Sequence, residues 1–288
     1  MEHTLEVSIL TLARGSLYAL IAVGFALVFG AGRVLNLFHG GFFLLGAYLA
    51  FLFSRMQAPL TAGPILATLL AAVSVGLLGY AYFWGFLRRY TRRPIQLMVV
   101  GVVANLLLAQ VLRAGYGTQA ASVVPIVAGT VRIGHAQVLW QEILIAVVAL
   151  VLFPGLGWLL RNTRTGGAIR AVAQDPRGAR LVGISPDQVL GTTVAVAAVL
   201  AGLAGALDAP VRVVSPDLWT FALLKSFTIV ILGGIGSLTG TLVMSYALGA
   251  VEVLGTSFFG EAGAEFLAVL IAVVALALRP RGVVGESG

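Results

Sequence analysis

Long apolar segments constrain this chain more than any other feature. Of its 288 residues, 59% are hydrophobic and only 10% are charged, whereas soluble domains carry about 25% charged residues. A soluble fold of this size could not cover its surface with so few charges. Uninterrupted apolar stretches of about 20 residues are what helices need to cross a bilayer. The composition therefore places the chain in a membrane.

The apolar pattern predicts an all-α, polytopic membrane helical bundle that forms one domain, residues 1–288. Eight apolar segments are expected, and they are roughly 8–30, 35–54, 63–87, 94–113, 138–160, 188–210, 223–256 and 264–279. The seventh is too long for a single crossing and contains GGIGSLTG at 233–240. We expect a helix, a glycine-rich break and a second helix, as two crossings or as a re-entrant piece and one crossing. The prediction is therefore eight or nine spans.

Basic residues predict the orientation, because cytoplasmic loops collect Lys and Arg. One set of loops carries two-thirds of the 18 basic residues: Arg33, Arg88, Arg89, Arg92, Arg93, Arg161, Arg164, Arg170, Arg177, Arg180, Arg279 and Arg281. The opposite side and the outer helix ends carry Arg14, Arg55, Arg113, Arg132, Arg212 and Lys225. The richer side should be cytoplasmic. With nine crossings, Met1 lies outside and Gly288 lies in the cytoplasm.

Composition and motifs exclude several classes of protein. The net charge of +7 fits cytoplasmic loops facing anionic lipids. The sequence lacks the basic residues interleaved with aromatics that are typical of nucleic-acid binding. The chain has no cysteine, which excludes disulfides and thiolate metal sites, and its histidines lack metal-ligand spacing. The N-terminal MEHTLEV is acidic, so the first apolar run should be retained as a span. Segment 114–137 is expected outside, as a short hairpin or a re-entrant piece.

The polar stretch 161–187 interrupts the apolar segments and carries its own helix signals. TGGAIRAVAQ is expected to form a short helix after the turn at Gly166–Gly167. Asp175 before Pro176 predicts the start of a second short helix, which should stop at Gly183. Ser185, followed by Pro186 and Gln188, predicts a capping box at the start of the next span. The loop should therefore be ordered, either as a basic segment on lipid headgroups or as a docking element for a cytosolic partner.

Three motifs carry a resemblance to a known family. GSLYALIAVGFALVFGAGRVLNLFHGGFFLLGAYLA (15–50), AIRAVAQDPRGARLVGISPDQV (168–189) and ILGGIGSLTGTLVMSYALG (231–249) together resemble the branched-chain amino acid ABC importer permeases of the LivH type. The resemblance covers nearly the whole chain in the same order. It implies an inner-membrane subunit that pairs with a paralogous permease, two ATP-binding subunits and an extracytoplasmic solute-binding protein.

In that family the polar loop contains coupling helices that sit in a cleft of the ATP-hydrolysing subunit. The resemblance implies this role for Arg170, Asp175, Arg177, Arg180 and Gly183. The chain has no GxxxxGK[ST] phosphate loop, so no cofactor is expected on it and ATP would be used by separate subunits.

Candidate substrate-pathway residues are polar groups and glycines within the apolar segments: Asn36, His39, Gly40, Gly233, Gly234, Gly236 and Glu252. Polar groups at membrane depth usually face a cavity or a partner, and broken helices can expose helix ends to a charged solute. Each has a structural alternative. Asn36 and His39 could satisfy backbone carbonyls, the glycines could permit close helix packing, and Glu252 could pair near a helix end. Asn105 is expected to be an interhelical hydrogen bonder.

Two other functions compete with an ABC importer subunit for branched-chain or similar small amino acids. A stand-alone secondary transporter of small polar solutes would need ion-coupling carboxylates at depth, and few acids are present there. A membrane-embedded enzyme would need a nucleophile, base and metal, which the motifs do not supply.

Overall fold

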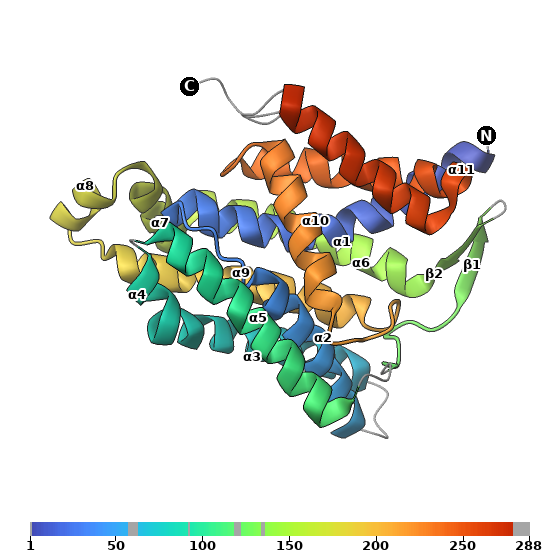
Figure 1. Ribbon diagram of the computed structural model, residues 1–288, viewed down its shortest axis with the longest axis horizontal. Coiled ribbons are helices and arrows are strands. Elements are labelled where there is room, and N and C mark those ends of the chain that lie inside the picture. Colours follow the sequence, from blue (N-terminus) through green and yellow to red (C-terminus); the bar gives the residue numbers. More distant parts are fainter. Residues whose placement is uncertain (1, 57–62, 92, 118–121, 134–135, 279–288) are drawn as a thin grey trace.

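A computed structural model describes residues 2–56, 63–91, 93–117, 122–133 and 136–278, and the chain is an elongated bundle of helices (Figure 1). The helices are α1 (Glu2–Gly32), α2 (His39–Met56), α3 (Gly63–Tyr82), the π-helix η1 (Phe83–Leu87), α4 (Arg88–Tyr90), α5 (Pro94–Tyr116), α6 (Trp140–Asn162), α7 (Arg164–Gln174), α8 (Pro176–Leu181), α9 (Pro186–Asp208), α10 (Leu218–Gly233) and α11 (Leu238–Leu278). The expected all-α bundle is confirmed.

Helices α1, α2 and α9 form the centre of the bundle. In the most apolar part of α1, 83% of residues are buried, against 22% in the corresponding parts of α5 and α6. Helices α2 and α9 approach closely because glycines face each other across them: a Cβ on Gly46 would lie 2.0 Å from the carbonyl oxygen of Gly202. A larger side chain at Gly46 would push the two helices apart, so glycine here is required by packing.

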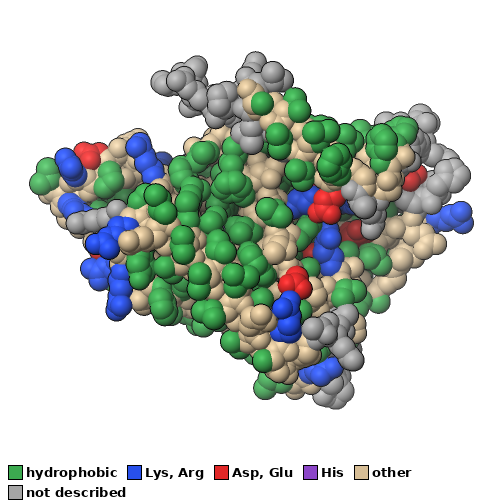
Figure 2. All heavy atoms as spheres, in the orientation of Figure 1, with side chains coloured by type: hydrophobic (Ala, Val, Ile, Leu, Met, Phe, Trp, Pro, Cys, Tyr) green, Lys and Arg blue, Asp and Glu red, His purple; other side chains and the backbone are tan. Residues whose placement is uncertain are grey.

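The outer helices expose apolar side chains along most of their length. Figure 2 shows hydrophobic side chains covering the face over α3 and α5, while basic side chains gather at the end formed by α4, α7 and α8. Six described helices are long and apolar enough to cross a membrane. Helix α2 and the shorter apolar α10 are not among them. A multi-pass membrane protein is thus supported, and the count of eight or nine spans stays a prediction.

The glycine-rich break is present where the sequence predicts it. Helix α10 ends at Gly233 and α11 starts at Leu238. Gly234 and Gly236 have φ angles of +91° and +90°, which L side chains rarely adopt. The segment expected at 264–279 is the continuation of α11 beyond a second non-helical residue, Gly260, with φ +71°.

The expected outer loop contains a β-hairpin rather than a re-entrant piece. Strands β1 (Thr130–Ile133) and β2 (Ala136–Leu139) pair antiparallel, with Thr130 opposite Leu139. Strand β2 runs directly into α6, so α6 begins two residues later than the segment expected from 138. In Figure 1 the hairpin lies at the end of the molecule opposite α7 and α8.

The polar loop is ordered, with two corrections to its expected caps. Helix α7 does not follow a Gly166–Gly167 turn: the hydroxyl of Thr163 accepts the Gly166 N–H at 3.1 Å, and both glycines lie inside the helix. A Cβ on Gly166 would meet the carbonyl oxygen of Leu159 at 2.3 Å. The predicted capping box at Ser185 is wrong, because its side chain caps no N–H although α9 starts at Pro186 as expected.

The second short helix, α8, has both of its predicted ends. The Asp175 carboxylate accepts the Arg177 N–H at 2.9 Å, and Pro176 is the first helical residue. At the other end, Gly183 has φ +82°. Its N–H donates to Arg180 at 3.1 Å, and the N–H of Ile184 donates to Ala179 at 2.9 Å. This pair of bonds is a Schellman motif, which requires the left-handed residue that glycine supplies.

Candidate functional site

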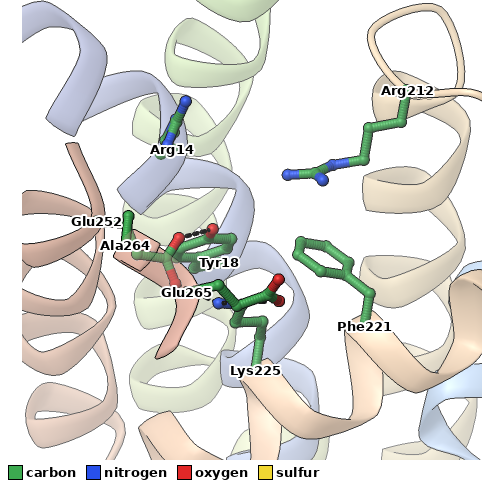
Figure 3. Close-up of a pocket in the computed structure, with 8 residues that line it drawn as sticks. All are labelled: Arg14, Tyr18, Arg212, Phe221, Lys225, Glu252, Ala264 and Glu265. Atoms are coloured by element: carbon green, nitrogen blue, oxygen red, sulfur yellow. Dashed lines mark hydrogen bonds and ion pairs between the residues drawn. The ribbon is translucent and has the colours of Figure 1, made fainter. Parts of the chain in front are cut away.

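A polar cavity of about 370 Å³ lies between α1, α10, α11 and the segment after α9. It is lined by Arg14, Tyr18, Arg212, Phe221, Lys225, Glu252, Ala264 and Glu265 (Figure 3). Charged side chains inside an apolar bundle are costly to bury and usually face a water-filled cavity or a partner. This cluster is therefore the leading candidate for a functional site.

The floor of the cavity is a buried three-residue contact. Lys225 of α10 forms an ion pair with Glu252 of α11, and the Tyr18 hydroxyl of α1 donates a hydrogen bond to the same carboxylate. Lys225 and Glu252 are only 7% and 5% exposed. Because an unpaired buried charge would be far more costly than the pair, these three side chains fix how α1, α10 and α11 meet.

The remaining charged groups surround this floor with fewer partners. The guanidinium of Arg14 reaches only the Thr256 hydroxyl, at 3.4 Å, and forms no ion pair with any side chain in the described ranges. Glu265 lies 3.7 Å from Lys225 and is 64% exposed. Arg212 is held by Asp208 at 3.1 Å, and it lies 4.1 Å over the Phe221 ring. Figure 3 shows Arg14 and Arg212 on either side of the space above Tyr18.

A second polar cavity, of about 270 Å³, adjoins the first through the two arginines they share. Its lining includes Arg14, Glu142, Asp208 and Arg212. Together the two cavities bring together acids and bases from five helices, α1, α6, α9, α10 and α11, and from the segment after α9.

Similarity to known proteins assigns this chain to a protein family. The family model described as the branched-chain amino acid transport system / permease component matches residues 8–284. The chain belongs to this permease family. The high-affinity branched-chain amino acid transport system permease protein BraD of Pseudomonas aeruginosa is 27% identical, covering 99% of this chain and 96% of that protein. The high-affinity branched-chain amino acid transport system permease protein LivH of Escherichia coli is 28% identical over 94% of this chain and 92% of its own length. No solved structure matches the chain.

More distant relatives are also transport proteins. A probable branched-chain amino acid transport permease protein LivH from Methanocaldococcus jannaschii is 25% identical over 94% of this chain and 89% of its own length. The expected LivH-type resemblance is thus confirmed. The chain is a transmembrane permease component of the ABC transporter class and not an enzyme.

Of the permease's predicted pathway residues, only Glu252 lines the polar cavity. His39 is 1% exposed, and its ring N–H donates to the Ile21 carbonyl at 2.8 Å. Asn36 is equally buried and accepts the Phe38 N–H at 3.2 Å. Gly40 packs on α10, because a Cβ there would lie 2.3 Å from the Trp219 carbonyl oxygen. These contacts favour the structural alternative for His39 and Gly40. Asn36 satisfies no backbone carbonyl, because its side-chain NH2 group is buried without a hydrogen-bond partner among the described residues.

The predicted glycines of the break also lie in tight helix contacts. A Cβ on Gly233 would lie 2.5 Å from the Gly240 carbonyl carbon, and one on Gly236 would lie 3.5 Å from Gly30 of α1. Gly234 serves as the left-handed residue after α10. Gly236 also lines a separate, mostly apolar cavity of about 470 Å³ beside α7. Asn105 donates to the Leu37 carbonyl at 2.7 Å, so it ties α5 to the turn between α1 and α2 and not, as expected, to another helix.

Three of the predicted coupling residues lie in the two short helices of the polar loop, Arg170 in α7 and Arg177 and Arg180 in α8, while Asp175 and Gly183 flank α8. Arg170 donates to the Arg161 carbonyl at 3.3 Å, while Arg177 and Arg180 are exposed on α8. Two large apolar side chains next to Arg180 in the sequence are exposed to solvent: Leu181 is 89% exposed and Val182 is 75% exposed. Such exposure at the tip of a charged loop is typical of a surface that another protein covers.

Sequence reasoning missed most of the polar cavity. It counted Arg14, Arg212 and Lys225 as charges of the outer side, whereas the fold brings all three to one site. A signal was available, because Lys225 is the sole charged residue within the apolar sequence LWTFALLKSFTIVILG of α10. A lone ionisable group at such a position indicates a functional site by default.

Proposed function

We propose that this permease is the transmembrane subunit of an inner-membrane ABC importer that moves branched-chain or related small amino acids inward. A paralogous permease would complete the pathway, two separate ATP-binding subunits would supply the energy, and an extracytoplasmic solute-binding protein would deliver the solute. The family match carries the class of transporter. The similarity to BraD and LivH, permease proteins of branched-chain amino acid transport systems, supports the class of solute.

The polar loop 161–187 is proposed as the element that receives motion from the ATP-binding subunits. The observation that supports this most directly is the exposure of Leu181 and Val182 on a helix whose ends are both capped. A loop that only met lipid headgroups would gain little from a fixed helix end. In this proposal Arg170, Asp175, Arg177, Arg180 and Gly183 position and flank the docking surface.

The crossing pattern and the pathway belong to the same proposal. Eight or nine crossings would leave the C-terminus in the cytoplasm and form one permease domain over residues 1–288. We propose that Glu252 lines the solute pathway. Asn36, His39, Gly40, Gly233, Gly234 and Gly236 are proposed to shape that pathway by holding α1, α2, α10 and α11 in register.

Reconstitution tests the function. The permease, its partner permease, the two ATP-binding subunits and the binding protein are assembled in liposomes, and uptake of labelled leucine is measured with and without ATP. We expect uptake only when ATP and the binding protein are both present. Uptake driven by an ion gradient without the ATP-binding subunits would instead establish a secondary transporter.

A further inference from the structure

We propose that the polar cavity between α1, α10 and α11 is a transit site for the zwitterionic head of an α-amino acid. In this site Arg14 binds the carboxylate and Glu265 binds the ammonium group. The inference rests on the proposed import of amino acids, and it adds which part of the solute the permease itself recognises.

The charged groups of the cavity fall into two sets, those that have an ion-pair partner at close range and those that do not. Lys225 and Glu252 are buried and paired with each other, and the Tyr18 hydroxyl donates to the other oxygen of that carboxylate. Arg212 lies 3.1 Å from the Asp208 carboxylate, an ion pair whose geometry is not that of a hydrogen bond, and its guanidinium lies over the Phe221 ring. These groups are committed to holding the helices together, so they are poor candidates for binding a solute that must also leave.

Arg14 and Glu265 have the opposite character. Arg14 has only a long hydrogen bond to Thr256, although it lines both polar cavities. A guanidinium presents a planar fork of donors that fits a carboxylate through two parallel hydrogen bonds. Glu265 is mostly exposed, and its contact with Lys225, at 3.7 Å, is at the outer limit of an ion pair. Among the described residues, a cation without an ion pair and a loosely held anion thus lie at one cavity, and they match the two charges of a zwitterion.

The lining also indicates that the head, rather than the side chain, is recognised. Tyr18 and Phe221 contribute rings, and Ala264 is the one aliphatic side chain among the lining residues. A pocket that selected a branched apolar side chain would be lined mainly by apolar groups. A volume of about 370 Å³ leaves space for water beside the solute, which keeps binding weak enough for release.

The absence of cysteine from the chain allows the site to be probed without transport. Ala264 lines the cavity but is only 2% exposed, so the Ala264→Cys complex is first shown to react with a small methanethiosulfonate reagent in the absence of solute. Its rate of modification is then measured with each solute present. Leucine should slow labelling about tenfold when its concentration is about ten times its dissociation constant, because protection follows 1 + [L]/Kd. Leucinamide, which lacks the carboxylate, and 4-methylpentanoate, which lacks the ammonium group, should protect far less.

Two variants and one control complete the test. Arg14→Gln and Glu265→Gln, each combined with Ala264→Cys, should abolish protection by leucine. Glu265 is 64% exposed, so its change to Gln leaves folding intact even if Arg14→Gln impairs assembly. Val124→Cys, 64% exposed in the outer loop, should label at one rate with or without leucine.

The outcomes separate this inference from the proposed function. Equal protection by all three compounds, protection by 4-methylpentanoate alone, no protection by leucine, or full protection in Glu265→Gln would each overturn the zwitterion site. ATP-dependent uptake of leucine by the wild-type complex would still stand in those cases. If leucine protects the thiol of the Ala264→Cys complex but the wild-type complex imports no leucine, the transport proposal fails and the site remains.

Discussion

Replacement of Gly183 by Val tests whether the polar loop transmits motion or only rests on lipid. The φ of +82° at Gly183 lies in the left-handed region, and a Cβ there would meet nothing within 4 Å. The whole cost of a side chain is therefore backbone strain, about 1–2 kcal/mol for an L residue. A penalty of that size lowers the population of the native helix end by a factor of about 5–30.

The consequence is confined to the end of α8. Without the left-handed residue, the hydrogen bonds from Gly183 to Arg180 and from Ile184 to Ala179 cannot both form. The exposed Leu181 and Val182 are then presented at another angle. Helix α9 starts independently at Pro186, so insertion and membrane abundance should be unchanged.

The assay compares variants in the purified complex with its partners. Gly183→Val should lose most uptake, and its ATP hydrolysis should no longer respond to the loaded binding protein. Gly167→Val is the matched control, because Gly167 lies in α7 of the same loop, has no neighbour within 4 Å and is helical. That control should behave like wild type.

A charge variant provides the opposite test. Arg177 and Arg180 are both changed to Gln, which weakens contact with anionic headgroups and leaves the helix ends intact. If this double variant loses uptake while Gly183→Val keeps it, the loop is a lipid anchor and the coupling argument is refuted.

Three further predictions concern topology, the break and the buried pair. An impermeant thiol reagent applied to intact cells should label Val124→Cys and spare Gln174→Cys; labelling of the latter would reverse the orientation. Gly234→Val, at φ +91°, should reduce uptake more than Gly155→Val, where a Cβ meets nothing within 4 Å; equal uptake at equal abundance would remove the special role of the break. Glu252→Gln should lower the free energy of unfolding by about 3 kcal/mol, since removing one partner of a buried pair strands the other charge, and an unchanged melting temperature in detergent would contradict this.

Local signals predicted the parts of the fold that local chemistry decides. Asp175 before Pro176 and Gly183 after α8 gave both helix ends, because capping depends on a few neighbouring backbone groups. The glycine-rich break was found for the same reason. Ser185 shows the limit of this reasoning, since a suitable cap residue and Pro186 start α9 without any side-chain hydrogen bond.

The cavity could not be predicted in the same way, because it depends on contacts between distant segments. Tyr18 and Glu252 are separated by 234 positions, and no local sequence signal near either residue predicts that the two side chains meet. Tertiary packing also decides whether a glycine position has room for a side chain, which the sequence alone does not show. Gly76 lies in a plain apolar run, yet a Cβ there would come 2.4 Å from Val199 of α9, so it is unsuitable as a neutral control for Gly234. Arg92, Met1, Arg279, Arg281 and Gly288, which entered the orientation argument, lie outside the described residues.

Helix α1 reaches both places where this apolar chain keeps its charges. Its N-terminal half carries Arg14 and Tyr18 into the cavity, and its other end packs on α7 and places Gly30 against Gly236. A close-packed helix transmits displacement as a body rather than by deforming, although position between two sites is not by itself evidence of coupling.

A double-variant cycle supplies that evidence. Gly183→Val, Arg14→Gln and their combination are compared by the leucine imported per ATP hydrolysed. Changes at distant, independent sites add to within about 0.5 kcal/mol. Each loss is expressed as a free energy from the ratio of the variant's value to that of the wild type. If α1 joins the polar loop to the cavity, the loss in the combined variant should be smaller than the sum of the two single losses by more than about 0.5 kcal/mol. Strict additivity would mean that the loop and the cavity act separately, whatever each contributes to transport.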